Sequence, residues 1–95
     1  AQEAAYKGAI TEATARLNMS YAQYILETNN KPANLTALGN STLLGTPLTA
    51  VNIGDYDVAY TFTGAAPTAT VGIQLNTKGA TDNLRSTTVP WPGNS

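Results

Sequence analysis

The chain of 95 residues contains neither cysteine nor histidine. Without cysteine it forms no disulfide and no thiolate metal site, and without histidine it lacks the commonest metal ligand and the commonest general base near neutral pH. No nucleophilic triad of the usual kind can be assembled, and the sequence has no Gly-rich phosphate loop followed by Lys and Ser or Thr. We therefore expect a protein that is not an enzyme and holds no cofactor and no metal.

Charged residues are also scarce. The chain has five Lys and Arg against six Asp and Glu, for a net charge of −1, and the basic residues are scattered. Nucleic-acid binding needs a concentrated positive field, so we expect no nucleic-acid partner. The sequence contains no apolar run long enough to span a bilayer and no signal-peptide pattern. Its length suits one small domain, which we take as residues 1–95.

The first 28 residues carry the pattern of an amphipathic helix. Apolar side chains recur at intervals of three and four and form one stripe. This stripe consists of Tyr6, Ile10, Ala13, Leu17, Tyr21 and Tyr24. The other face carries Lys7, Glu12, Arg16, Gln23 and Glu27, with Glu12 and Arg16 at a favourable i,i+4 spacing. Asn29, Asn30 and Pro32 are expected to end the helix after Thr28.

The helical pattern is already regular at Ala1, with no N-cap, which is typical of the lower half of a longer helix. A helix over 1–28 would span about 42 Å at 1.5 Å per residue, which is long for a domain of this size. We therefore expect much of it to protrude or to face a partner.

Residues 29–48 are predicted to be a connecting loop, with a helical turn over 33–38, held to the core by its leucines. Three strands are predicted over 49–53, 56–63 and 68–76, which together form an antiparallel meander over 49–76. Its apolar face includes Val58, Tyr60, Phe62, Val71, Ile73 and Leu75. Gly54-Asp55 suits a type II′ turn.

Residues 77–95 are polar and turn-rich, with no periodic pattern. We expect Trp91, between Pro90 and Pro92, to dock on the sheet or to fill a pocket between subunits. Only the long helix has a stripe that matches the apolar face of the sheet. The predicted fold is therefore α+β, with a long N-terminal amphipathic helix packed on a three- to four-stranded antiparallel meander.

Acidic side chains seldom lie close together in the sequence. Asp55 and Asp57 flank a predicted hairpin position, and Asp82-Asn83 is a second short pair. A calcium loop needs several more oxygen ligands in a fixed rhythm, so we interpret both pairs as turn chemistry and solvated positions.

Two other features have structural interpretations. The tyrosines of the helical stripe fit core packing better than stacking on bases or sugars. Glycosylation sequons begin at Asn18, Asn34 and Asn40, but about two such matches arise by chance in a chain so rich in Asn, Ser and Thr. We draw no conclusion from them.

This order of elements resembles the type IV pilins of bacteria and the related pseudopilins. The resemblance is carried by Ala22, Tyr24, Thr28-Asn29-Asn30-Lys31-Pro32, Leu35 and Leu38-Gly39. These residues are similar to the end of the pilin helix, where a Tyr-x-x-x-Asn-Gly-x-x-Pro-like stretch precedes a Leu-x-x-Leu loop. Here Asn30 stands where Gly is common, and the proline comes one residue early. The resemblance in the order of elements covers the whole chain.

The resemblance implies a structural subunit of a type IV pilus-like filament that self-assembles through its N-terminal helix. In such proteins a very hydrophobic segment precedes the region that residues 1–95 resemble, anchors the subunit in the inner membrane and later forms the buried core of the fibre. The implied partners are other copies of the chain, other pilins and the membrane, and the implied location is the bacterial surface. Residues 1–95 by themselves are expected to be monomeric, with loops 39–49 and 77–88 on the fibre surface.

Two departures from the family matter. Many pilins close the C-terminal region with a disulfide, and major pseudopilins often hold it with calcium. This chain has no cysteine, and it lacks the acidic cluster that a calcium site needs. The resemblance then implies that Trp91 and its flanking prolines form the C-terminal lock, and that a pilus subunit is favoured over a major pseudopilin.

Two rival functions remain open. A minor pilin or adhesive module would hold a ligand pocket around Tyr56, Tyr60 and Trp91. A pseudopilin of a type II secretion system would bind calcium near Asp55, Asp57 or Asp82.

Overall fold

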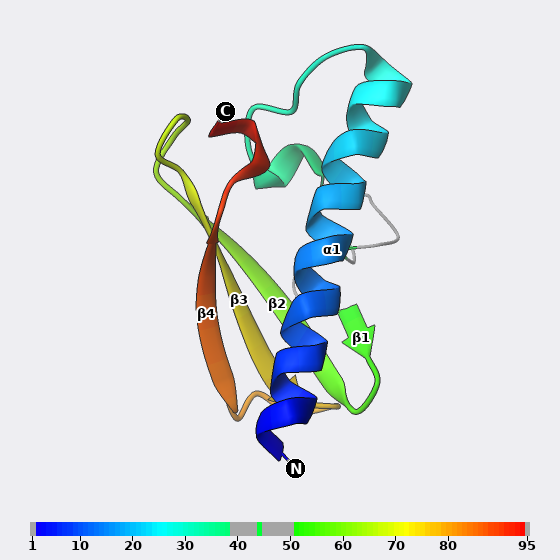
Figure 1. Cartoon of the computed structure of the whole chain (residues 1–95), viewed down its shortest axis with the longest axis vertical. Helices are drawn as coiled ribbons and strands as arrows, with labels where there is room; N and C mark the ends of the chain where they lie inside the picture. The colour runs from blue at the N-terminus through cyan, green and yellow to red at the C-terminus, as the bar shows by residue number, and fades with distance from the viewer. Residues whose placement is uncertain (1, 39–43, 45–50, 95) are drawn as a thin grey trace.

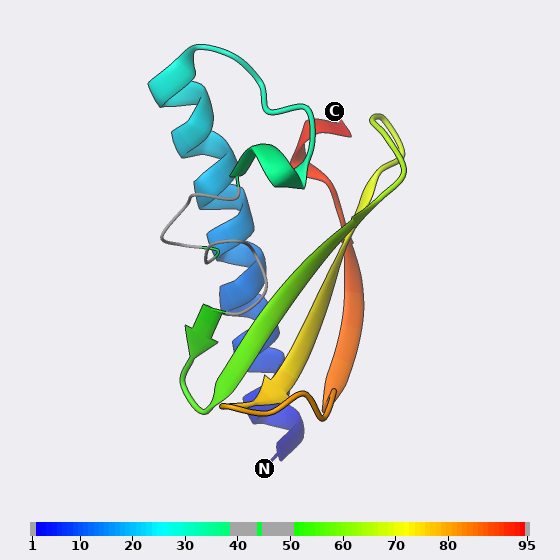
Figure 2. The same ribbon diagram turned by 180° about the vertical axis from the view of Figure 1, so that it is seen from behind.

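A computed structural model describes residues 2–38, 44 and 51–94 (Figure 1). Its elements are α1 (Gln2–Thr28), the 3₁₀ turn η1 (Leu35–Leu38), β1 (Val51–Ile53), β2 (Tyr56–Thr63), β3 (Thr70–Thr77), β4 (Arg85–Pro90) and the 3₁₀ turn η2 (Pro92–Asn94). The strands form one antiparallel sheet in the order β1-β2-β3-β4. The helix covers one face of this sheet, as the two opposite views show (Figures 1 and 2). The expected α+β class is confirmed.

The long helix ends where its sequence predicts. Asn29 adopts φ +58, the left-handed conformation common just after a helix, and its N–H donates to the Ile25 carbonyl at 2.8 Å. The hydroxyl of Thr28 accepts the N–H of Asn30 at 3.2 Å. Pro32 follows and is buried. In the part of the chain that the structure describes, no helix is both long and apolar enough to cross a membrane.

The meander places the predicted apolar residues on one face. Tyr60 lies opposite Ile73, and Val58 lies opposite Leu75, so the apolar side chains of β2 and β3 share a face. Gly54 has φ +61, as the first central residue of a type II′ turn requires. β3 begins at Thr70, two residues later than predicted. Residues 49 and 50 of the first predicted strand lie outside the described residues.

The region after residue 76 differs from its prediction. Residues 85–90 form the edge strand β4, which pairs with β3 through Val71 and Val89, whereas the sequence predicted a turn-rich segment and an exposed loop over 77–88. Its half-buried side chains are those of Arg85, Thr87 and Val89, so burial alternates while hydrophobicity does not. Pairing with β3 thus outweighs the strand's own weak pattern.

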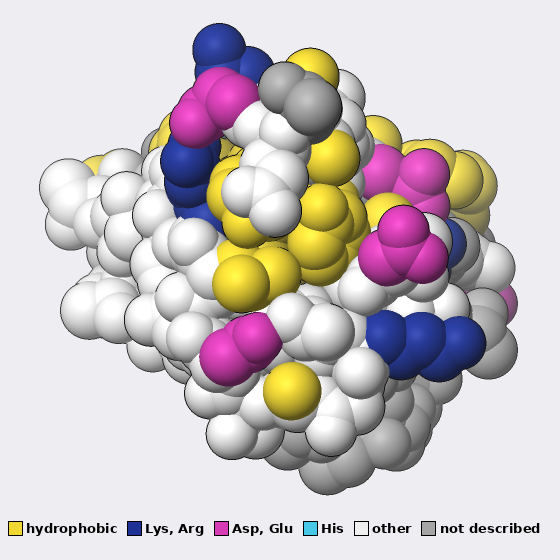
Figure 3. Space-filling view, turned by 90° about the horizontal axis from the view of Figure 1, so that it is seen from below, with side chains coloured by type: hydrophobic (Ala, Val, Ile, Leu, Met, Phe, Trp, Pro, Cys, Tyr) yellow, Lys and Arg dark blue, Asp and Glu magenta, His cyan; other side chains and the backbone are white. Residues whose placement is uncertain are grey.

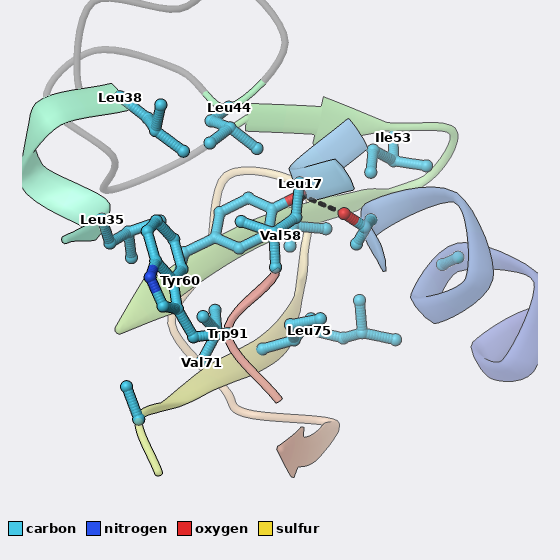
Figure 4. Close-up of a cluster of buried hydrophobic side chains, with 14 residues drawn as sticks. Leu17, Leu35, Leu38, Leu44, Ile53, Val58, Tyr60, Val71, Leu75 and Trp91 are labelled. Atoms are coloured by element: carbon cyan, nitrogen blue, oxygen red, sulfur yellow. Dashed lines mark hydrogen bonds between the residues drawn. The ribbon is translucent and has the colours of Figure 1, made fainter. Parts of the chain in front are cut away.

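The core lies between α1 and the sheet and extends under η1 (Figure 4). It consists of Ala9, Ala13, Leu17, Leu35, Leu38, Leu44, Ile53, Val58, Tyr60, Ala69, Val71, Ile73, Leu75 and Trp91. Three of the predicted anchoring leucines of the loop are therefore buried, while Leu43 and Leu48 lie outside the described residues. Half-buried side chains packed against this core include Tyr6, Ile10, Tyr21, Tyr24 and Phe62.

The helix approaches the sheet through small side chains. Ala9 and Ser20 are buried together with Ala13 and Leu17, although the spacing of apolar residues did not single out either of them. Because an alanine or serine lets the helix backbone come close to the sheet, the larger tyrosines are displaced to the flanks. These tyrosines are half-buried and pack against the core.

Candidate functional site

The C-terminal segment is fastened to the sheet through Trp91, which is 2% exposed. The indole ring meets the rings of Tyr21 and Phe62 edge-to-face, with centroids 5.4 and 5.1 Å away. The N–H of Trp91 donates to the carbonyl of Ala69 at 3.1 Å. Of the two expected positions for this side chain, docking within the domain is the one observed.

Two neighbours complete this fastening. The side chain of Asn94 donates to the carbonyl of Ala69 at 2.8 Å and accepts its N–H at 3.2 Å. Gly93 lies so close to the aromatic cluster that a Cβ there would stand 2.6 Å from Nε1 of Trp91 and 3.1 Å from the hydroxyl of Tyr21. A glycine is therefore required at this position for close approach, which no sequence pattern had indicated.

A groove of about 400 Å³ runs beside the buried tryptophan, between α1 and the end of β4. Its lining residues are Thr14, Leu17, Asn18, Val89, Pro90, Trp91, Pro92 and Asn94. None of them is charged. Of the three residues expected around a ligand pocket, only Trp91 lines this groove. Tyr60 lies with Trp91 in the buried core, and Tyr56 only packs against that core from a half-buried position.

Tyr60 points into the core, where its hydroxyl donates to the carbonyl of Ala13 at 2.9 Å (Figure 4). Burial raises the pKa of Tyr60 to about 12. The side chain therefore stays neutral near pH 7 and joins the middle of α1 to β2. It is a structural contact and does not line the groove.

Tyr56 lies near the N-terminal end of α1. Its ring meets that of Tyr6 at a centroid distance of 5.7 Å, and the guanidinium of Arg85 lies over the Tyr6 ring at 5.2 Å. Arg85 also donates two hydrogen bonds to the carboxylate of Glu3, one of them at 2.8 Å. The hydrogen bonds from Arg85 lower the pKa of Glu3. Figure 3, which views the molecule from below, shows hydrophobic side chains at this end ringed by charged ones.

Asp57, Asp82 and Asn83 serve the turns, as the sequence suggested. The carboxylate of Asp57 accepts the N–H of Gly79 at 2.9 Å. Asp82 accepts both the hydroxyl of Thr77 at 2.6 Å and its N–H at 2.8 Å, and these hydrogen bonds lower the pKa of Asp82. Asn83 has φ +49 and donates its N–H to Asn76 at 2.9 Å. Over residues 2–38, 44 and 51–94, no three acidic side chains gather into a possible metal site.

The outer face of α1, directed away from the sheet, is unusual for a surface helix. It exposes Ala4, Gly8, Ala15, Met19, Ala22 and Leu26. Met19 is 56% exposed and Leu26 is 85% exposed. Glu12 interrupts this face in one turn, between Gly8 and Ala15, and pairs with Arg16 at the side of the face at 2.8 Å, as their spacing predicted. We call this set of six residues the outer apolar face.

Gly8 adds a second observation on that face. A Cβ at this position would meet nothing within 4 Å, so the fold of the domain does not need a glycine here. A glycine inside a helix costs roughly 0.5–1 kcal/mol relative to alanine. The domain therefore carries a destabilising residue on its exposed helical face without a packing reason of its own.

The sequons occupy different settings. Asn18 is exposed on α1, but Ser20 of the same sequon is buried. Asn34 is exposed, and its side chain accepts the N–H of Ala37 at 3.2 Å at the start of η1. The third sequon, at 40–42, lies outside the described residues.

Comparison of the chain with protein-family models, with curated proteins and with solved structures gave no match. The surfaces described above therefore carry the functional proposal.

Proposed function

We propose that this chain is a structural subunit of a type IV pilus-like filament and that it assembles through α1. The observation that carries the proposal is the outer apolar face. An ordinary surface helix turns apolar side chains to the core and charged ones to water. This helix has apolar or small side chains on two opposite sides, so it is suited to pack against its own sheet and against a neighbour at once.

The dimensions of the helix support this role. Its 27 residues span about 40 Å at 1.5 Å per residue. The whole molecule is 40 Å along its longest axis. The outer apolar face, from Ala4 to Leu26, thus runs along most of this length, and only the turn between Gly8 and Ala15 carries polar residues, Thr11 and Glu12. If this face of each subunit contacts a different surface of the next subunit, the contact repeats from subunit to subunit and gives an open helical polymer.

The proposal requires an apolar helical segment encoded before Ala1. Burial of that segment would supply most of the driving force for polymerisation, at about 25 cal/mol per Å² of apolar surface. Before assembly it would anchor the subunit in the inner membrane, and afterwards the filament would stand at the cell surface. The segment of 95 residues alone is then monomeric.

The first test is to read the residues encoded before Ala1. A short basic leader ending in Gly, followed by about twenty apolar residues, is the expected result. A secretion signal that is cleaved directly before Ala1 would refute the filament proposal.

The second test uses the full gene product. Ala15→Arg and Ala22→Arg place a long cation on the outer apolar face, whereas Thr61→Arg places it on the exposed far side of the sheet. We expect the first two variants to abolish filaments seen by electron microscopy and the third to retain them. Because all three positions are exposed, the unfolding free energy of each 95-residue domain should stay within about 0.5 kcal/mol of the parent. Filaments that tolerate both helix variants would refute the proposed role of α1.

One observation favours a second candidate, an adhesive or ligand-binding module of the minor-pilin type. The groove beside Trp91 falls within the size range of small-ligand sites, about 300–1,000 Å³. The indole face is buried, so the groove offers no exposed aromatic ring for a sugar to stack on. Nuclear magnetic resonance titration of the domain with small neutral ligands tests this candidate, and shifts confined to the lining residues would support it.

A further inference from the structure

The groove and the outer apolar face lie on the same helix. Thr14, Leu17 and Asn18 form the helical wall of the groove. Asn18 is exposed, and Ala15 and Ala22 of the outer apolar face are its i−3 and i+4 neighbours. The uncharged surface therefore continues from the groove around the helix to Met19 and Leu26.

Leu26 is the most exposed large hydrophobic side chain among the described residues, at 85%. No charged side chain lines the groove, and five of its eight lining residues are apolar. A buried leucine suits such a lining, whereas a charged or strongly polar occupant would lose its hydration without a partner. The uncharged, mainly apolar lining of the groove therefore suits the exposed side chain of Leu26 near the end of α1.

We propose that the groove of one subunit receives Leu26 of a second copy of the chain. This inference rests on the proposed filament function and specifies one of its contacts. It makes the second copy the occupant of the groove, in place of a free small ligand.

Leu26 and the groove lie at different heights along α1, so the proposed contact shifts one subunit along the helix axis relative to the next. Leu26 lies about eight to twelve residues beyond the helical wall of the groove, which is about 12–18 Å along the axis. With neighbouring helices parallel, each contact therefore advances the next subunit by about that distance. The same pair of surfaces is then used repeatedly, and the polymer does not close.

The absence of cysteine makes a direct test available. Leu26→Cys and Asn18→Cys are introduced together into the full gene product. Because cysteine fills the groove less well than leucine, the filaments are assembled at a subunit concentration well above the one that the parent needs, and are then oxidised. Both side chains are exposed in the domain, so neither change should disturb the fold. The matched control pairs Leu26→Cys with Thr61→Cys, which is exposed on the far side of the sheet. Disulfide formation requires the two Cα atoms to come within about 7 Å.

We expect a ladder of covalent multimers from the first pair and none from the control. A product that stops at the dimer would mean a two-fold, antiparallel contact and would overturn the inference. Normal filaments that give no ladder would overturn it while leaving the filament function intact. Failure of the unmodified gene product to form filaments would overturn both.

A second variant removes the apolar side chain without adding a thiol. Leu26→Ala should raise the subunit concentration needed for assembly about ten-fold or more, because a fully buried leucine contributes strongly to such a contact. Gln23→Ala, an exposed change on the same helix, should leave that concentration unchanged. Equal assembly of both variants would contradict the proposed position of Leu26.

Discussion

The same substitution at two glycines should change stability in opposite directions. At Gly8 an added methyl group meets nothing within 4 Å. Alanine there removes the conformational cost of a glycine inside a helix, so Gly8→Ala should stabilise the domain by about 0.5–1 kcal/mol. At Gly93 the methyl group would stand 2.6 Å from Nε1 of Trp91 and 3.1 Å from the hydroxyl of Tyr21. Both rings belong to a packed cluster, so Gly93→Ala should cost about 1–3 kcal/mol.

Thermal and urea unfolding of the 95-residue domain, followed by circular dichroism, measures both effects. For a domain of this size 1 kcal/mol shifts Tm by about 4–8 °C, so the two variants should lie on opposite sides of the parent. The near-ultraviolet signal of Trp91 should change in Gly93→Ala alone. A Gly93→Ala domain as stable as the parent would mean that the Trp91 cluster is not packed as described. A loss of stability in Gly8→Ala would show that the outer apolar face is already occupied in the isolated domain.

Three further predictions concern single contacts. Tyr60→Phe removes the hydrogen bond to the carbonyl of Ala13 and should cost about 1 kcal/mol at pH 7. The pKa of Tyr60 is raised from 10.0 to about 12 in the folded domain, so the parent should lose stability between pH 10 and pH 12. The difference in unfolding free energy between the parent and Tyr60→Phe, measured by urea unfolding, should therefore narrow over that range. The pKa of Glu3 is lower in the folded domain than its value of 4.5 in the unfolded chain, so the ionised carboxylate stabilises the domain at pH values above 4.5. This stabilisation is lost as the pH falls through the pKa of Glu3 in the folded domain. Parent and Glu3→Gln should therefore differ in Tm at pH 7 and converge in strong acid, and a difference that persists there would contradict the role of the Arg85 contact. Asn29 holds φ +58 after α1, so Asn29→Gly should be tolerated, whereas Asn29→Val should lower Tm, since β-branched residues strongly disfavour that conformation. Equal Tm values for the two Asn29 variants would argue against this helix end.

The sequence predicted most of the fold because its signals are local and regular. The end of α1 follows from Asn29, Asn30 and Pro32, and the apolar face that β2 and β3 share follows from strict alternation. β4 was missed because its stability comes from pairing with β3, a contact distant in the sequence. Ala9 and Ser20 were missed for a different reason. A search for hydrophobic periodicity detects large apolar residues, whereas the helix positions nearest the sheet are occupied by small residues.

The candidate surfaces were harder to anticipate than the fold. Trp91 could be singled out as too large to remain exposed, but its position inside the domain depends on Tyr21 and Phe62, which are far from it in the sequence. The groove is formed by α1 and the C-terminal segment together, so no local motif encodes it. The outer apolar face was within reach of the sequence. Its apolar character was missed because Glu12 and the charged residues beside it dominate the pattern on the exposed side of the helix.

Gly8 links the stability of the domain to its proposed assembly. In the isolated domain a methyl group at this position is free of contacts and should be favourable. In a filament where a neighbour packs closely on the outer apolar face, the same methyl group would hold the two surfaces apart and weaken their contact. Gly8→Ala in the full gene product should therefore raise the unfolding temperature of the domain and reduce the yield of filaments. One methyl group with opposite effects in the two assays would show that the glycine serves the contact and not the fold. An unchanged filament yield would mean that no neighbour packs closely at Gly8.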